Sequence, residues 1–263
     1  MALATAISRA TILLAGCLGI CAGLSEALAA PAAVGTGLAA YAMKSFQNAQ
    51  ARYQQAPGEA AAAWQFGRAC FDLAEFATNN TQRASLANLG IAACQRAMAR
   101  ESNSAPAHYY LGLNLGQLAR TVALGALKLV DQMEREFIRA HDLDERFDCA
   151  GPDRSLGLLY LDAPTIVSIG SRTRAREHLK RAVELAPQYP ENRLSLIEAY
   201  LKWGERTSAN RELQGLEAAW PAARTNFVGE AWAASWADWD PRLKKLKKKI
   251  EEPPKALGAP REK

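Results

Sequence analysis

Hydroxyl groups are the first candidates for chemistry in this sequence. Residues 168–171, with the sequence SIGS, offer two serines, but no histidine and acid accompany them in the spacing of an activated nucleophile. The sequence also lacks the G-x-S-x-G, P-loop, H-E-x-x-H and G-x-G-x-x-G motifs. We therefore predict a non-catalytic protein without a cofactor.

Metal ligands are the second candidates. An acidic cluster follows Ala140, but it lacks the glycine and the terminal glutamate of an EF-hand loop. Its members are Asp142, Asp144, Glu145 and Asp148. The three histidines are far apart, and no Cys-x-x-Cys pair occurs. The sequence predicts a solvated turn at the acidic cluster and no metal site.

The beginning of the chain resembles an export signal. Arg9 precedes an apolar run over residues 10–24, and an A-x-A cleavage pattern follows at Ala27 and Ala29. We expect residues 1–29 to be a signal peptide and the protein to be periplasmic or otherwise exported. As an alternative, residues 14–17, LAGC, resemble a lipobox, which would make Cys17 a lipid-modified anchor. No other long apolar stretch occurs.

The net charge of +5 is concentrated at the end of the chain. Residues 241–263 hold nine Lys and Arg against three Glu, a local charge of +6 that leaves about −1 for the rest. The body of the chain does not interleave basic and aromatic residues, so no nucleic-acid groove is expected.

Two internal periods organise the middle of the sequence. Glycines recur 45 residues apart, at Gly67, Gly112 and Gly157. A second pattern recurs after 34 residues, with an alanine, a leucine, a small or aliphatic residue and a proline. Its two copies are Ala175, Leu179, Ala182, Pro187 and Ala209, Leu213, Leu216, Pro221.

Helix pairing explains both periods. Alanine is abundant and β-branched residues are sparse, which favours helices. Spacings of four and three place residues on one helix face. A glycine inside a helix costs about 1 kcal/mol against alanine, so its recurrence indicates a close helix crossing. In this interpretation Gly157 contacts the helix that carries Ala175 and Leu179, and Pro187 ends that helix.

These patterns resemble tetratricopeptide repeats from about Ala60 to Pro221. The match is strongest in LGLLY (residues 156–160) with AREHLKRAVELAPQYPEN (residues 175–192), and weaker in WQFGRACF (residues 64–71). The resemblance implies an all-α superhelical solenoid of about four helix pairs. A shorter likeness, in GPDRSLG (residues 151–157) and the helix after it, resembles the T-component of bacterial TRAP transporters, which works beside a substrate-binding protein.

We expect a domain of helical repeats over residues 30–223, capping helices over 224–251 and a disordered tail over 252–263. Asp240 and Pro241 would begin the capping helix, with Leu243, Leu246 and Ile250 on its apolar face. The lysines of this helix could alternatively contact anionic lipid.

Stacked helix pairs present a concave face that binds partners. Counting from the glycines, we expect first-helix side chains to line it: Trp64, Arg68, Tyr109, Gln117, Arg154 and Glu198. Arg154→Ala should then weaken partner capture without changing stability, and packing between repeats is the alternative role of Trp64 and Tyr109. A protein partner is expected, and a small ligand is the second possibility.

Cys70 and Cys94 take positions where the repeat family places an aromatic and the large residue packed against it. Two small thiols on facing helices of an exported protein could form a disulfide. Buried free thiols are the alternative.

Overall fold

A computed structural model describes residues 32–122 and 125–252, and for residues 32–36 it describes the backbone alone. The predicted signal peptide, the lipid-modified Cys17 and the tail beyond Glu252 lie outside the described residues.

The described residues form helices and contain no strand. The elements are α1 (Ala32–Gln55), α2 (Ala60–Ala74), α3 (Asn80–Arg100), α4 (Ala105–Ala119), α5 (Ala126–Leu143), α6 (Phe147–Asp162), α7 (Arg172–Leu185), α8 (Pro190–Lys202), α9 (Arg206–Asn226), the 3-10 helix η2 (Glu230–Trp232) and α10 (Ala233–Glu251). This all-helical secondary structure confirms the predicted all-α fold class.

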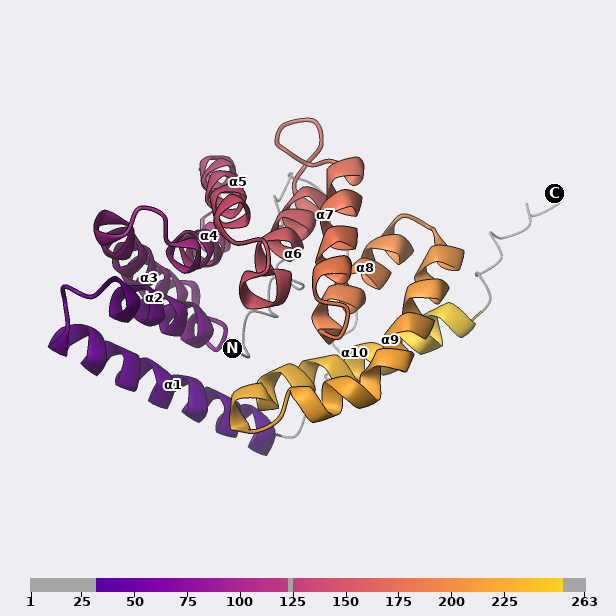
Figure 1. The fold of residues 1–263 in the computed structure, drawn as a ribbon, viewed down its shortest axis with the longest axis horizontal. Coiled ribbons are helices and arrows are strands. Elements are labelled where there is room, and N and C mark those ends of the chain that lie inside the picture. The colour runs from indigo at the N-terminus through magenta and orange to yellow at the C-terminus, as the bar shows by residue number, and fades with distance from the viewer. Residues whose placement is uncertain (1–31, 123–124, 253–263) are drawn as a thin grey trace, which may run out of the picture.

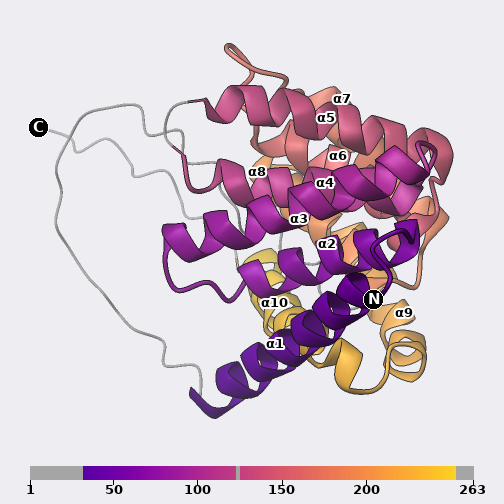
Figure 2. The same ribbon diagram turned by 90° about the vertical axis from the view of Figure 1, so that its left-hand side faces the viewer.

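Consecutive helices pack as pairs, and the pairs stack into a curved superhelix (Figure 1). The pairs are α2 with α3, α4 with α5, α6 with α7 and α8 with α9. Each first helix also contacts the first helix of the next pair, and α10 packs on α8 and α9 as a further first helix would. Figure 2 shows α2, α3, α4 and α5 side by side along the stack. The four predicted pairs with a final capping helix are confirmed.

Each of the three periodic glycines lies against the second helix of its own pair. A methyl group at Gly67 would come 2.3 Å from Cys94 Sγ, and one at Gly112 would come 2.5 Å from the ring of Phe137. At Gly157 it would come 2.6 Å from Leu179 Cγ. Real Cβ atoms do not approach so closely, so the close crossings predicted from the spacing are confirmed.

The 45-residue period has two structural causes. The second helices of the early pairs are long, with 21 residues in α3 and 18 in α5, against 14 in α7. A left-handed turn at Asp148, Cys149 and Ala150 adds further residues before the right-handed part of α6. Longer second helices and an inserted turn therefore both contribute to the 45-residue spacing.

The helix α1 was not identified as a separate element from the sequence. It packs on α2 ahead of the first pair, and its Phe46 and Tyr53 rings lie 5.4 and 5.3 Å from the ring of Phe66. These contacts cover the outer side of the first pair, so the stack is covered at both ends. Within residues 32–122 and 125–252, no helix is long and apolar enough to cross a membrane.

Two helix boundaries differ from expectation because aromatic packing extends the helices through prolines. α9 continues past Pro221 to Asn226. α10 begins at Ala233, seven residues before the predicted start at Asp240, and contains Pro241. The rings of Trp220 and Trp236 are 5.4 Å apart and hold the two helices together at this corner.

Candidate binding face on the first helices

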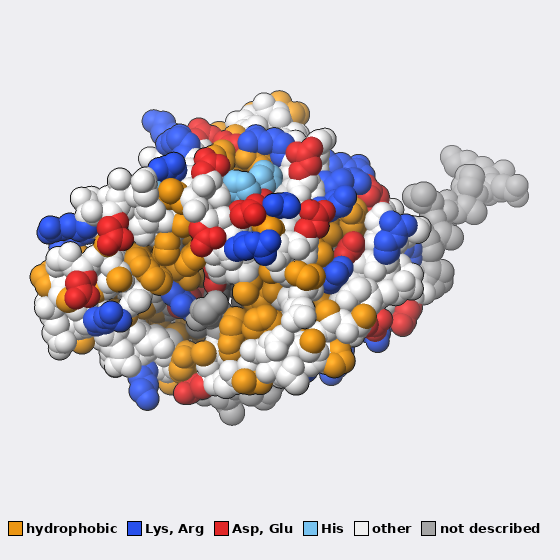
Figure 3. All heavy atoms as spheres, in the orientation of Figure 1, with side chains coloured by type: hydrophobic (Ala, Val, Ile, Leu, Met, Phe, Trp, Pro, Cys, Tyr) orange, Lys and Arg blue, Asp and Glu red, His pale blue; other side chains and the backbone are white. Residues whose placement is uncertain are grey.

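The first helices line the inner side of the superhelix. In Figure 1, α4 and α6 lie nearer the centre of the curve than α5 and α7. The space-filling view shows a hollow in the middle of this face, with hydrophobic side chains on both flanks and a few charged side chains among them (Figure 3). This face is the candidate binding surface.

Trp64 and Arg68 keep part of their surface exposed on the predicted face. Trp64 stacks on Tyr110 of the next pair, with ring centroids 5.9 Å apart and planes 2° apart, and it contacts Phe147 edge-on at 6.4 Å. The guanidinium of Arg68 lies 5.9 Å from the Tyr110 ring centroid and 3.5 Å from Asp72. Trp64 therefore takes the alternative role, packing between repeats, while remaining half-buried.

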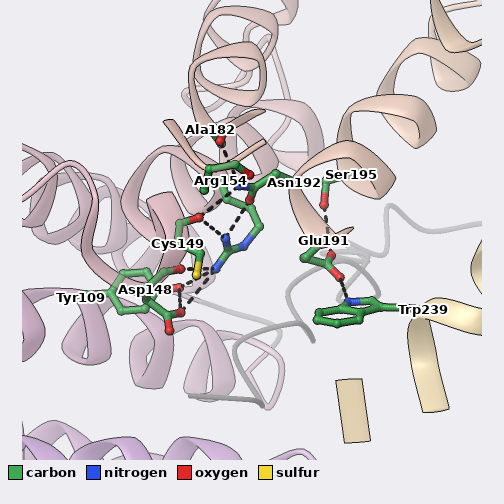
Figure 4. A network of polar contacts seen from close by, with 10 residues as sticks. Tyr109, Asp148, Cys149, Arg154, Ala182, Glu191, Asn192, Ser195 and Trp239 are labelled. Atoms are coloured by element: carbon green, nitrogen blue, oxygen red, sulfur yellow. Dashed lines mark hydrogen bonds and ion pairs between the residues drawn. The ribbon is translucent and has the colours of Figure 1, made fainter. Parts of the chain in front are cut away.

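The structure places Tyr109 and Arg154 differently from the sequence prediction, because both are buried. Their exposed fractions are 0% and 1%. The Tyr109 hydroxyl donates to Asp148 Oδ2 at 3.2 Å, and Arg154 Nη2 lies 3.4 Å from the same oxygen. Arg154 Nη1 donates to Asn192 of α8 at 2.8 Å (Figure 4). The prediction that Arg154 lines the groove was wrong. Arg154 is buried and forms an ion pair with Asp148.

Arg154 also holds an unfavourable backbone turn. Asp148, Cys149 and Ala150 have φ values of 50°, 57° and 62°, a left-handed conformation that costs roughly 1–2 kcal/mol per residue outside glycine. The Cys149 carbonyl accepts from Arg154 at 3.2 Å and from Asn192 at 3.1 Å. The Asp148 carbonyl accepts from Arg154 at 3.4 Å (Figure 4). These bonds offset the strain and fix the junction between three first helices.

Gln117 and Glu198 bind neighbouring helices. Gln117 is 2% exposed and donates to Glu75 at the end of α2, so it is not a free groove residue. Glu198 is partly exposed and accepts two hydrogen bonds from Arg242 of α10, at 3.0 and 2.9 Å. Long polar side chains on a first helix were predicted to face a ligand, but the adjacent helix is close enough to bind them.

A second buried network attaches the capping helix. Glu191 is 1% exposed and accepts from Arg242 at 2.8 and 3.0 Å, from Trp239 at 3.0 Å and from Ser195 at 3.1 Å. Asp238 also pairs with Arg242 at 2.7 Å. Burial raises the pKa of Glu191, and Arg242 opposes that rise. α10 is thus tied to α8 by a charged contact as well as by its apolar side.

Asp72 is a buried carboxylate of α2 whose contact with a cation, Arg68, is 3.5 Å long. It is 6% exposed, its Oδ1 has no hydrogen-bond partner, and burial raises its pKa from 3.8 to about 6 against the opposing effect of Arg68. A carboxyl whose pKa is higher in the folded state favours folding below its unfolded pKa, near 3.9, and this contribution disappears as the pH rises to the folded value.

We therefore expect the wild type to lose about 2 kcal/mol of stability relative to Asp72→Asn between pH 4 and pH 6. The variant has no carboxyl to titrate at this site, so its own curve lacks this component. Urea unfolding at pH 4, 5, 6 and 7 measures the difference. If the unfolding free energies of the two proteins changed in parallel with pH, Asp72 would not be a buried carboxyl that titrates in this range.

A contact between His141 of α5 and His178 of α7 was not predicted from the sequence. Asp153 is buried, and its two carboxylate oxygens accept from Nδ1 of His141 at 3.0 Å and from Nδ1 of His178 at 2.7 Å; the two histidine ring centroids are 6.2 Å apart. Their separation of 37 residues, near the repeat period, is the one signal that could have revealed it. In the described part of the chain no group of three or more His, Cys, Asp or Glu could hold a metal ion.

Cys70 and Cys94 are both free thiols with fully buried side chains. The sulfur of Cys94 fills the space left by Gly67, which gives this small side chain a packing role without a partner sulfur. Burial raises the pKa of Cys70 to about 12 and raises that of Cys94 as well. Thiols with such high pKa values are poor nucleophiles. Of the two alternatives, the structure therefore has free thiols at Cys70 and Cys94 and no disulfide between them.

Comparison with known proteins supports the fold. No family model matches the sequence, and no curated protein matches it. A thermophilic tetratricopeptide-repeat protein of Thermus thermophilus superposes with a TM-score of 0.52 and 18% identity, covering 82% of this chain and 93% of that one. Yeast Tom70 matches with a TM-score of 0.28 and 12% identity, over 95% of this chain and 73% of that one. At such low identity the first likeness establishes the architecture alone: this chain has the fold of a tetratricopeptide-repeat-like helical solenoid.

Proposed function

We propose that this chain is an exported, non-catalytic binding protein that engages a protein partner through the inner face of its superhelix. Two observations carry the proposal: the hollow between apolar flanks on that face (Figure 3), and the partial exposure of Trp64 and Arg68 on α2. Partly exposed Trp and Arg are among the residue types that dominate binding energies at protein interfaces. Helical-repeat solenoids of this kind generally serve protein interaction.

The buried networks support this proposal. Tyr109, Arg154 and Asn192 fix the angle between neighbouring first helices, and Glu191 with Arg242 fixes the capping helix. A rigid curved face loses little conformational entropy on binding, which favours affinity. Export rests on the sequence of residues 1–29 and belongs to the proposal.

The ion pair of Arg68 and Asp72 provides the test. The double variant Arg68→Gln with Asp72→Asn removes both charges, keeps polar side chains at both positions and leaves neither member of the ion pair charged without its partner. We expect it to capture at least tenfold less partner from a periplasmic extract, because a desolvated arginine contact is lost. Affinity capture with quantitative mass spectrometry measures the effect.

The matched control is Arg181→Gln with Glu145→Gln, which removes an exposed ion pair of 2.8 Å between α7 and the α5–α6 turn. It should capture as much partner as the wild type. Equal capture by all three proteins would refute binding at the inner face.

A second candidate is an accessory role beside a solute-binding protein, like that of a TRAP transporter T-component. The segment that carries this likeness, residues 151–157, contacts neighbouring helices closely. A methyl group at Gly151 would come 2.7 Å from the Tyr109 ring of α4, and Asp153 accepts hydrogen bonds from His141 of α5 and His178 of α7. The apolar flanks of the hollow suit a solute with a hydrophobic portion (Figure 3). Native mass spectrometry of the purified chain distinguishes the two: a bound small molecule supports this candidate, and its absence favours the protein partner.

A further inference from the structure

The outward side of α10 is a face of lysines. Lys244, Lys245, Lys248 and Lys249 are all exposed, and Lys244, Lys245 and Lys248 follow spacings that place them on one side of the helix. The opposite side holds Trp239, Leu246 and Ile250, which are at most 9% exposed and pack into the core. The face lies at the C-terminal end of the stack, where α10 runs behind α9 (Figure 1).

Charges within α10 leave this face basic, because its one exposed carboxylate, Glu251, stands against four exposed lysines. Asp238 is paired with Arg242 at 2.7 Å, and Asp240 is paired with Arg224 at 2.5 Å. Lys248 is 79% exposed and lies 3.7 Å from Glu252, too far and too solvated for a strong pair. The sequence adds Lys255, Arg261 and Lys263 after the helix, against Glu252 and Glu262.

From this arrangement we infer that the lysine face of α10 binds the surface of an anionic lipid bilayer. Clusters of four or more basic residues on a helix attract acidic headgroups electrostatically. The apolar side of α10 is occupied by α8 and α9, so the helix cannot insert as an amphipathic membrane helix does. The contact is therefore electrostatic, confined to the surface and sensitive to salt.

A bilayer fits this face better than a nucleic acid does. Both aromatic residues of the helix point inward: Trp239 is fully buried, and the Trp236 ring lies 4.9 Å from that of Trp239. No stacking platform for bases accompanies the lysines. The predicted export of the chain also favours a membrane surface. This inference is independent of the proposed inner-face partner.

Vesicle sedimentation of the full chain tests the inference. We expect binding to vesicles of 70% phosphatidylcholine and 30% phosphatidylglycerol at 50 mM NaCl, and loss of that binding at 500 mM NaCl. Each lysine near an anionic surface strengthens partitioning about fivefold. The triple variant Lys244→Gln, Lys245→Gln, Lys249→Gln should therefore bind roughly a hundredfold more weakly. Vesicles of phosphatidylcholine alone measure any contribution of an N-terminal anchor.

The control variant is Lys44→Gln, Lys128→Gln, Lys180→Gln, which removes three exposed lysines from α1, α5 and α7. It has the same net charge as the α10 variant and should bind as the wild type does. Circular dichroism checks that both variants remain folded. Equal weakening by the two variants would mean that total charge, and not this face, drives binding. No binding to the anionic vesicles, or binding to duplex DNA in their place, would overturn the inference.

Discussion

Replacing Arg154 by alanine is expected to lower the free energy of unfolding by about 3–5 kcal/mol. The guanidinium is 1% exposed, and its loss leaves the Asp148 carboxylate buried beside a tyrosine. Burial already raises the pKa of Asp148, and Arg154 is the largest influence opposing that rise. The variant also loses the donors that hold the left-handed turn through the carbonyls of Asp148 and Cys149. Chemical unfolding at pH 7 measures the change.

Arg181→Ala is the matched control, because its side chain is 46% exposed and its ion pair with Glu145 lies on the surface. It should cost less than about 1 kcal/mol. A second comparison, Arg154→Ala with Asp148→Asn, removes the charge left without a partner and should recover part of the loss. An Arg154→Ala protein as stable as the Arg181→Ala control would show that the buried pair does not support the fold.

Gly157→Leu is the second change with a large expected effect, about 3 kcal/mol or more. A Cβ at this position would come 2.6 Å from Leu179 Cγ and 3.0 Å from the Leu179 backbone nitrogen. Overpacking of a well-packed core typically costs 1–3 kcal/mol. The backbone contact raises the cost, since α7 itself would have to move. Thermal and chemical unfolding measure the loss.

Gly58→Leu is the matched control, because a Cβ at Gly58 would meet no atom within 4 Å and this glycine does not have a positive φ. Its stability should stay within about 0.5 kcal/mol of the wild type. Equal unfolding midpoints for Gly157→Leu and Gly58→Leu would contradict the close crossing of α6 and α7.

The sequence and the structure agree where a residue type has a single physical reason for its position. A glycine that recurs inside helices indicates a close crossing, and Gly67, Gly112 and Gly157 all contact their partner helices. Ser171 caps α7 by accepting from the Arg174 amide at 3.3 Å, as its place before the helix predicts. Proline was less reliable, since both Pro221 and Pro241 lie inside helices that tryptophan packing extends.

The residues that line the groove could not be identified from spacing alone. Counting from a glycine assigned Tyr109 and Arg154 to the sides of first helices that face away from their own partners, yet the Tyr109 ring lies 6.0 Å from that of Phe137 on its partner α5. That side can face either solvent or the next pair, and the choice depends on the tilt between pairs. The sequence could not supply this tilt, because the left-handed turn at Asp148 has no signature in a stretch of ordinary residues.

The sequence by itself therefore determined the all-α class, the four pairs, their glycine contacts and the charge of the last helix, because periodicity and composition act within one or two helices. Only the tertiary structure decided which polar residues face a hollow and which are buried. It brought Arg154 to Asp148 and Asn192, Glu191 to Arg242, and His141 to His178. Apart from the pair of Arg154 and Asp148, these contacts join residues that are 37 to 51 positions apart in the sequence. They therefore depend on how whole helices are oriented relative to one another.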